Sequence, residues 1–259
     1  MSLYQQCGLK FYFSYLGGWK EAPTAALACG SITHEVIEHV YRLPAQERTL
    51  DAAIELMRDH GSRMFRKPEY QRFESNNSVR AQIREAVENL FRVEKPAELV
   101  VQPEHLEMEL NVDINGVHFF GKVDRFTADG VNRVTDYKTG KGPGRYVDDK
   151  LSQPYLYGLA FKTQYDIDID EVELIFLNAQ EIVRRPADQA IMISMGEKLA
   201  VMHADSQRDV VASAWDAKVQ RLCDYCAFEK VCPARVADAP VPGSPESDIQ
   251  LLELGLTTR

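Results

Sequence analysis

Hydrophobic positions divide the chain into a mainly helical first part and a strand-rich middle. Ile32, Val36 and Val40 recur at helical spacing, and Ser31 stands before them as a candidate N-cap, so we expect a helix over residues 31–43. Similar amphipathic or apolar stretches predict further helices at residues 3–16, 50–65, 79–93, 151–163 and 187–206.

Strict alternation of apolar and polar residues replaces this helical period in the middle of the chain. Residues 106–114 alternate in this way, which predicts a half-buried strand, and Asn115-Gly116 is a tight-turn signal directly after it. Three more apolar runs predict strands at residues 117–126, 131–137 and 171–177, of which the first two read as a hairpin turning at Asp129-Gly130. The order of elements predicts a mixed α/β fold, with a central mixed β-sheet flanked by helices.

This order also suggests how the chain is divided. We expect a single domain over residues 1–236, with a mainly helical region at 1–98, a sheet core at 99–180, and a helix with a cysteine-bearing segment at 181–236. Residues 237–259 contain three prolines and a glycine within a few positions, and this composition predicts a flexible tail.

Composition adds limits to this picture without changing it. The 259 residues are 45% hydrophobic and 27% charged, as in ordinary globular proteins. No apolar run approaches 18 residues, so we expect no membrane association. The N-terminus lacks the basic start and long apolar core of a signal peptide, so a cytoplasmic location is expected.

The net charge of −9 argues against a protein coated in nucleic acid, but it leaves room for a local basic path. Residues 133–150 could form such a path, because basic residues are frequent there: Arg133, Lys138, Lys141, Arg145 and Lys150.

Two carboxylates and a lysine lie on the expected hairpin. Asp136 and Lys138 are alternate residues of one strand and therefore share a face, and Asp124 converges on that face if the two strands pair. Two carboxylates bind a hard divalent cation, and an adjacent ammonium group can polarise a water or stabilise an oxyanion. These residues therefore point to the cleavage of phosphodiester bonds.

Four short motifs surround and include these residues. They follow one another along the chain as Gly30-Ser-Ile-Thr-His34, Gly121-Lys-Val-Asp124-Arg125, Asp136-Tyr-Lys138-Thr-Gly140 and Gln153-Pro-Tyr-Leu-Tyr157. In type and order they resemble the RecB-like branch of the PD-(D/E)xK nuclease superfamily, from Leu3 to about Ala234. That branch includes RecB and AddB nuclease domains, CRISPR-associated RecB-like exonucleases and phage exonucleases.

The resemblance implies a restriction-endonuclease-like fold and a role for each matching residue. His34, Asp124 and Asp136 would ligate Mg²⁺ or Mn²⁺ with help from the Tyr137 carbonyl, and a histidine among oxygen ligands makes Mn²⁺ plausible. Lys138 would orient the attacking water and stabilise the phosphate in the transition state. The two remaining matches, Gln153 and Tyr157, would position that lysine and the DNA strand.

Two glutamates and one proline near these motifs also bear on the site. Glu107 or Glu109 could add a further carboxylate, although pairing within the sheet is sufficient to explain both. Pro154 is tolerated in the first turn of a helix, so the helix that carries Gln153 is expected to begin near Ser152.

Cysteines near the C-terminus suggest a second metal centre. Cys223, Cys226 and Cys232 form a C-x2-C-x5-C cluster, a close spacing that suits metal binding but supplies only three ligands. In the iron–sulfur members of the RecB-like branch the fourth cysteine lies near the N-terminus, and Cys7 fits that place. The resemblance thus implies a 4Fe-4S cluster, with zinc as the competing assignment, and leaves Cys29 as a core thiol.

The function implied by the resemblance is a metal-dependent DNA exonuclease acting on single strands or DNA ends. The setting would be DNA recombination and repair, phage DNA metabolism or CRISPR spacer acquisition. Two alternatives stay open: a non-catalytic or weakly catalytic DNA-binding module of a recombination or adaptation complex, and an endonuclease or RNase on the same core. The chain lacks G-x-x-x-x-G-K-[ST], so unwinding would need a helicase or complex partner, and a homo-oligomer is possible.

Overall fold

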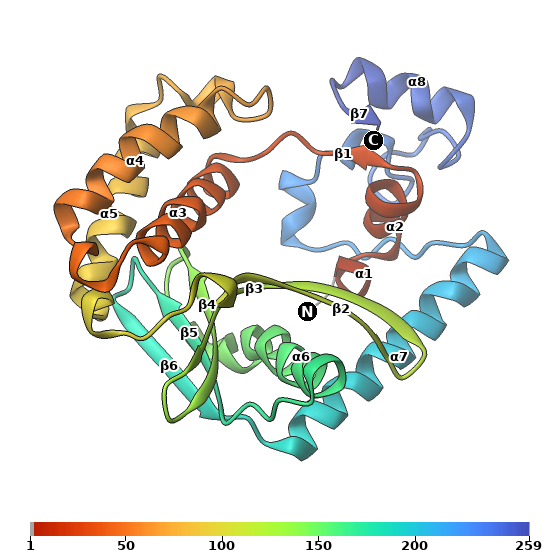
Figure 1. Cartoon of the computed structure of the whole chain (residues 1–259). Helices are drawn as coiled ribbons and strands as arrows, with labels where there is room; N and C mark the ends of the chain where they lie inside the picture. Colours follow the sequence, from red (N-terminus) through yellow and green to blue (C-terminus); the bar gives the residue numbers. More distant parts are fainter. Residues whose placement is uncertain (1–2, 259) are drawn as a thin grey trace. The chain divides into compact units, whose positions relative to one another are not determined.

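The computed structural model describes residues 3–258, and it divides the chain into two compact units (Figure 1). One unit is Pro23–Lys198, and the other combines Met1–Ala22 with Leu199–Arg259. The two ends of the chain share a hydrophobic core of their own. The single domain expected over residues 1–236 stays a prediction.

A five-stranded sheet forms the centre of the Pro23–Lys198 unit. Its strand order follows the sequence: β2 (Leu106–Ile114), β3 (Val117–Ala128), β4 (Asn132–Lys138), β5 (Glu171–Phe176) and β6 (Glu181–Pro186). Only β4 and β5 run parallel; the other neighbours are antiparallel. The predicted mixed α/β fold with a central mixed sheet flanked by helices is confirmed, and it agrees with a restriction-endonuclease-like architecture.

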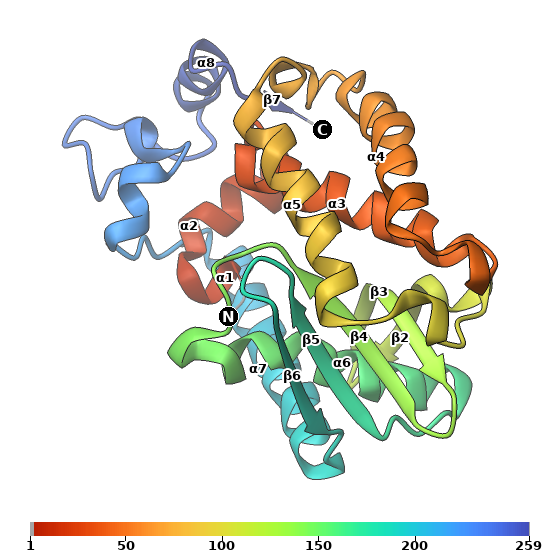
Figure 2. The same cartoon turned by 90° about the vertical axis from the view of Figure 1, so that its left-hand side faces the viewer.

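Helices cover both faces of this sheet, as can be followed in Figure 2. They are α3 (Ala25–Arg42) and α5 (Asn77–Val93) on one face and α6 (Val147–Tyr165) on the other. Helix α4 (Leu50–Phe65) packs on α3 and α5, and the long helix α7 (Gln189–Ala212) runs from this unit into the other. On one face Tyr137 and Ile175 share a core with Tyr41 of α3 and Leu90 of α5. On the other face Phe126 lies 4.9 Å from Phe161 of α6, measured between ring centroids. None of the helices among residues 3–258 is long and apolar enough to cross a membrane.

Side-chain caps fix where α3 and α4 begin. The Thr24 side chain accepts a hydrogen bond from the backbone N–H of Leu27, and Thr49 does the same for Ala52. The expected N-cap at Ser31 is wrong: α3 begins at Ala25, six residues earlier, because Ala28 and Cys29 extend its buried stripe.

Helix α6 begins earlier than its proline suggested. The expected start near Ser152 is wrong, since the helix begins at Val147 and contains Pro154 in its interior. A proline there removes one backbone hydrogen bond, to the carbonyl of Lys150. The helix tolerates this loss because Leu151, Tyr155 and Phe161 are buried beside it.

The second unit joins the two ends of the chain. It contains α1 (Leu3–Gln6), α2 (Gly8–Phe11), a π-helical turn at Tyr12–Leu16, α8 (Pro245–Glu253) and the paired short strands β1 (Trp19–Lys20) and β7 (Thr257–Thr258). Phe13 stacks on Phe228, with ring centroids 4.9 Å apart, and Leu251 and Leu256 are buried in the same core. Residues 237–258 thus differ from the flexible tail expected there, because α8 has an N-cap at Ser244 and an apolar side that the core covers.

Candidate active site

The strand registers bring three carboxylates to one level of the sheet. Strands β2 and β3 pair Met108 with Val123, and strands β3 and β4 pair Arg125 with Thr135. Continued by one residue, these registers place Asp124 between Glu107 of β2 and Asp136 of β4. The residues predicted from the hairpin therefore come together, and a third carboxylate joins them.

Asp124 is held from two sides. Its Oδ1 atom lies 3.2 Å from Nδ1 of His34 on helix α3, and its Oδ2 atom accepts a hydrogen bond of 2.7 Å from the backbone N–H of Tyr137. The His34 ring also meets the Tyr137 ring edge to face at 6.4 Å. The helix and the hairpin thus present one histidine and one carboxylate to the same point.

Asp136 and Lys138 form the second part of the site. The Lys138 Nζ atom lies 2.7 Å from Oδ2 of Asp136. The Asp136 side chain is almost fully buried, and the Lys138 ammonium is the charged group that compensates its Oδ2 atom. A carboxylate carries further lone pairs, so Asp136 can keep this ion pair and still bind a cation.

The pKa values of the site reflect this crowding of negative charge. Burial raises the pKa of Asp136, and the nearby Asp124 carboxylate adds to the effect, giving a pKa of about 6. Burial by itself would lower the pKa of His34, but the charge and hydrogen bond of Asp124 outweigh it and raise the pKa to about 9. A bound divalent cation would relieve the repulsion between the carboxylates.

Of the two glutamates that the sequence offered as a further carboxylate, Glu107 is the one that lies at the site. Its ligand atom lies within 4.8 Å of those of His34 and Asp124, and the three side chains could together hold a metal ion. Asp136 is not a member of this 4.8 Å group. Burial raises the pKa of Glu107, and Lys122 lies 2.9 Å from its carboxylate.

Glu107 has an unusual backbone conformation. Its φ of +53° is in the left-handed region, which a glutamate rarely adopts, and the residue is left out of the otherwise regular β2–β3 pairing. Glu109 stays in the ladder opposite Lys122, is exposed, and is not brought into the site.

Helix α6 presents Gln153 and Tyr157 to the site. The Gln153 Nε2 atom donates a hydrogen bond of 2.5 Å to the Tyr157 hydroxyl. Burial first, and the Asp136 charge after it, raise the pKa of Tyr157, so the phenol stays protonated. A Cβ on Gly121 would lie 2.7 Å from the Tyr157 ring, so the glycine that opens the first acidic motif leaves room for this tyrosine.

Comparison with known proteins agrees with the geometry. A model of the PD-(D/E)XK nuclease superfamily matches residues 1–233. The chain belongs to the PD-(D/E)XK nuclease superfamily. A search of curated proteins finds no match. Family membership makes this chain a metal-dependent nuclease, with DNA as the substrate that the superfamily implies.

The residues of this nuclease fit a divalent cation. Carboxylates are the ligands that Mg²⁺ and Mn²⁺ prefer, and a histidine among them favours Mn²⁺. His34, Glu107 and Asp124 each offer one ligand atom within 4.8 Å of the other two, which is close enough to share one ion. The Asp136 carboxylate, which is paired with Lys138, lies next to this group and offers a further acceptor.

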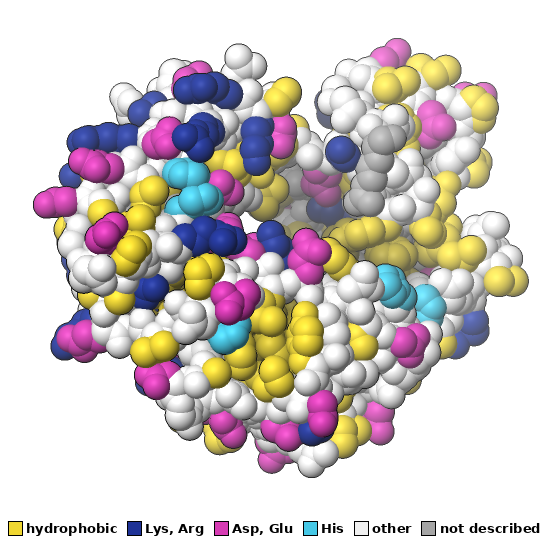
Figure 3. Space-filling view, viewed as in Figure 1, with side chains coloured by type: hydrophobic (Ala, Val, Ile, Leu, Met, Phe, Trp, Pro, Cys, Tyr) yellow, Lys and Arg dark blue, Asp and Glu magenta, His cyan; other side chains and the backbone are white. Residues whose placement is uncertain are grey.

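The basic segment of the nuclease is less open to DNA than its sequence suggested. Arg133 pairs with Glu171 at 2.7 Å, and the Lys150 ammonium donates to the carbonyls of Gly142 and Pro143. Lys141 stays exposed in the loop after β4. Figure 3 shows further Lys and Arg side chains gathered over the helices drawn at the upper left, α4 and α5.

Four of the five cysteines line one pocket in the unit formed by the chain ends. They are Cys7, Cys223, Cys226 and Cys232. Two of their sulfur atoms accept backbone N–H groups: Cys7 from Lys10 at 3.5 Å, and Cys223 from Gln220 at 3.3 Å. Both contacts cap the start of a short helix, α2 after Cys7 and the helical turn at Arg221–Tyr225.

The fifth cysteine lies elsewhere. Cys29 is buried in the core between α3 and α5, where its thiol contacts the Val79 carbonyl at 3.7 Å, and burial raises its pKa. It has the surroundings of a core thiol.

Proposed function

We propose that this nuclease hydrolyses the phosphodiester bonds of single-stranded DNA or of DNA ends, as an exonuclease of the RecB-like branch. The observation that carries the proposal is the convergence of Asp124 and Asp136 at one level of the sheet, with Lys138 paired to Asp136 and His34 beside Asp124. The order of the four motifs along the chain supports the RecB-like assignment.

Each residue has a distinct part in this reaction. His34, Asp124, Asp136 and the Tyr137 carbonyl are proposed to hold the cation, and Glu107 is close enough to assist them. A bound Mg²⁺ or Mn²⁺ would supply Lewis-acid stabilisation of the phosphate and lower the pKa of water. The Lys138 ammonium, held by Asp136, would orient the attacking water and stabilise the charge that develops on the phosphate oxygens. Gln153 and Tyr157 would position the lysine and the strand.

Closed DNA circles distinguish an exonuclease from an endonuclease. With Mn²⁺, we expect release of nucleotides from linear single-stranded DNA and no cleavage of a covalently closed single-stranded circle of the same sequence. The measurement is acid-soluble label from the linear strand and gel mobility of the circle. Cleavage of the circle at a comparable rate would instead support the endonuclease alternative, and cleavage of neither would support a non-catalytic DNA-binding module.

The four-cysteine pocket is proposed to hold a 4Fe-4S cluster of structural role. Tetrahedral zinc, with Zn–S bonds of about 2.3 Å, needs sulfur atoms roughly 4 Å apart. Within the described residues, no three of these sulfur atoms lie within 4.8 Å of one another, which supports a larger cluster over a single zinc ion. The cluster would connect Cys7 to a segment about 215 residues later and so close a long loop.

Replacing Cys226 with serine tests this assignment. Anaerobically purified protein should be brown, with absorbance near 400 nm, and C226S should lose that absorbance because one thiolate ligand is gone. C29S is the matched control and should keep the colour, since Cys29 lies outside the pocket. A colourless wild-type protein with stoichiometric zinc would contradict the cluster in favour of zinc.

The pathway that such an exonuclease serves follows from the resemblance alone. Recombination and repair, phage DNA metabolism and CRISPR spacer acquisition are the proposed settings, in which a helicase or a recombination or adaptation complex would be the partner.

A further inference from the structure

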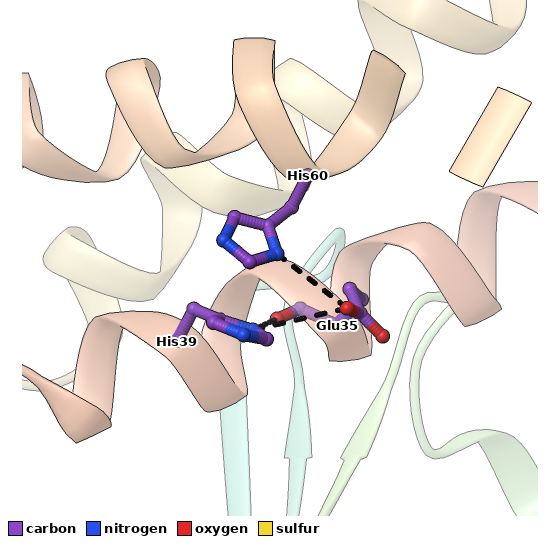
Figure 4. Close-up of side chains that lie close together, drawn as sticks. All are labelled: Glu35, His39 and His60. Atoms are coloured by element: carbon purple, nitrogen blue, oxygen red, sulfur yellow. Dashed lines mark hydrogen bonds and ion pairs between the residues drawn. The ribbon is translucent and has the colours of Figure 1, made fainter. Parts of the chain in front are cut away.

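A second group of side chains that could bind a metal lies between α3 and α4. It is separate from the group formed by His34, Glu107 and Asp124. Glu35 and His39 are one turn apart on α3, and His60 comes from α4 (Figure 4). The Glu35 Oε1 atom lies 3.5 Å from Nδ1 of His60 and 3.9 Å from Nδ1 of His39. One ligand atom of each of the three side chains lies within 4.8 Å of the other two.

The two imidazoles are already close together and partly oriented. Their ring centroids are 3.6 Å apart, and Nδ1 of His39 lies 2.8 Å from the Glu35 backbone carbonyl. A carbonyl oxygen can only accept, so this contact requires a proton on Nδ1 and leaves Nε2 of a neutral His39 free as a ligand. Hydrogen bonding of the non-ligating nitrogen is the usual way in which proteins orient a metal-binding histidine.

Two arginines on α3 and α4 are paired with carboxylates other than Glu35. Arg42 is paired with Glu38 at 2.6 Å, and Arg63 is paired with Asp59 at 2.7 Å. Within the described residues, the only ion-pair partners of Glu35 are the two histidines. Its side chain is about one-third exposed, so an ion from solvent can reach it.

We propose that Glu35, His39 and His60 bind a divalent transition metal of the Zn²⁺ class. Two imidazole nitrogens and one carboxylate oxygen are a ligand set that zinc accepts, with a fourth position left to water. Two ligands come from α3 and one from α4, so the ion fastens these helices together. The site shares no residue with the His34–Glu107–Asp124 group, although Glu35 follows His34 directly, because adjacent helical residues point about 100° apart.

Histidine NMR tests the site without reference to nuclease activity. The background is full-length D124N/D136N, which disables the carboxylate centre, with ¹⁵N-labelled histidine. On addition of Zn²⁺ at constant pH, we expect the ring signals of His39 and His60 to shift and those of His105, His118 and His203 to stay in place. Zinc should also raise the melting temperature of this protein by a few degrees.

Single substitutions in the same background complete the test. E35Q and H60Q should weaken zinc binding at least tenfold and abolish the rise in melting temperature, whereas H118Q, at an exposed strand position, should leave both unchanged. E35Q keeps the shape of the side chain, so a fold defect is not expected to complicate the result. Unshifted His39 and His60 signals at saturating Zn²⁺, or full binding in both E35Q and H60Q, would overturn the proposal.

Discussion

Replacing Arg125 with methionine is expected to lower the free energy of unfolding by about 3–5 kcal/mol. The Arg125 side chain is 2% exposed, and its guanidinium lies 2.9 Å from Glu94 and 3.6 Å from Glu173. It also contacts the Tyr137 hydroxyl. Methionine would fill much of the volume but would leave buried carboxylates short of their positive partner. Urea unfolding, followed by circular dichroism, measures the loss.

Arg133, on the neighbouring strand β4, offers a matched control. It pairs with Glu171 at 2.7 Å, but both side chains are partly exposed, so R133M should cost no more than about 1 kcal/mol. R125M combined with E94Q should recover part of the stability, because one of the unpaired charges is then removed. Equal losses in R125M and R133M would contradict the importance given to burial.

Replacing Lys138 with methionine is expected to reduce DNA cleavage by at least about 100- to 1000-fold, the typical cost of removing one transition-state donor. Methionine keeps part of the alkyl stem and removes the ammonium that lies 2.7 Å from Asp136. The melting temperature should change little, since Lys138 is about one-third exposed. Single-turnover cleavage of labelled DNA at saturating Mn²⁺ measures the effect.

Lys141 provides the control for Lys138. It lies three residues further on, is exposed, and has the same charge, so K141M should alter the rate only by a small factor. Full activity of K138M at saturating Mn²⁺ would remove Lys138 from the role proposed for it.

Local sequence patterns were sufficient for most of the central sheet. Alternation from Leu106 onward and the Asn115-Gly116 turn predicted β2 and β3, and both turn residues adopt the positive φ that such a turn requires. The prediction that Asp124 would converge with Asp136 needed only the pairing of two neighbouring strands, and that pairing is local in sequence.

Features that depend on distant contacts could not be predicted in this way. The role of Arg125 in a buried ion-pair cluster requires Glu94 and Glu173, which are far apart in sequence. The choice between Glu107 and Glu109 depends on the register of β2 against β3, which the sequence left open. Strand β6 is mostly polar and exposed, so it carries no apolar signal of its own and owes its place to pairing with β5.

The division into two units was hidden for a similar reason. The core that joins the two ends combines side chains far apart in sequence, such as Phe13 and Phe228, and strand β1 pairs with β7. Only the resemblance pointed to this long-range pairing, because it implied Cys7 as a fourth partner for the C-terminal cysteines.

The central claim is that the Asp124–Asp136–Lys138 group hydrolyses DNA with the aid of a divalent cation. The most direct measurement is the release of labelled nucleotides from linear single-stranded DNA by the wild-type protein and by D136N, as Mn²⁺ is varied and then removed with EDTA. We predict Mn²⁺-dependent release by the wild type that stops with EDTA, and none above background by D136N. Release that persists without a divalent cation, or equal release by D136N, would contradict the account.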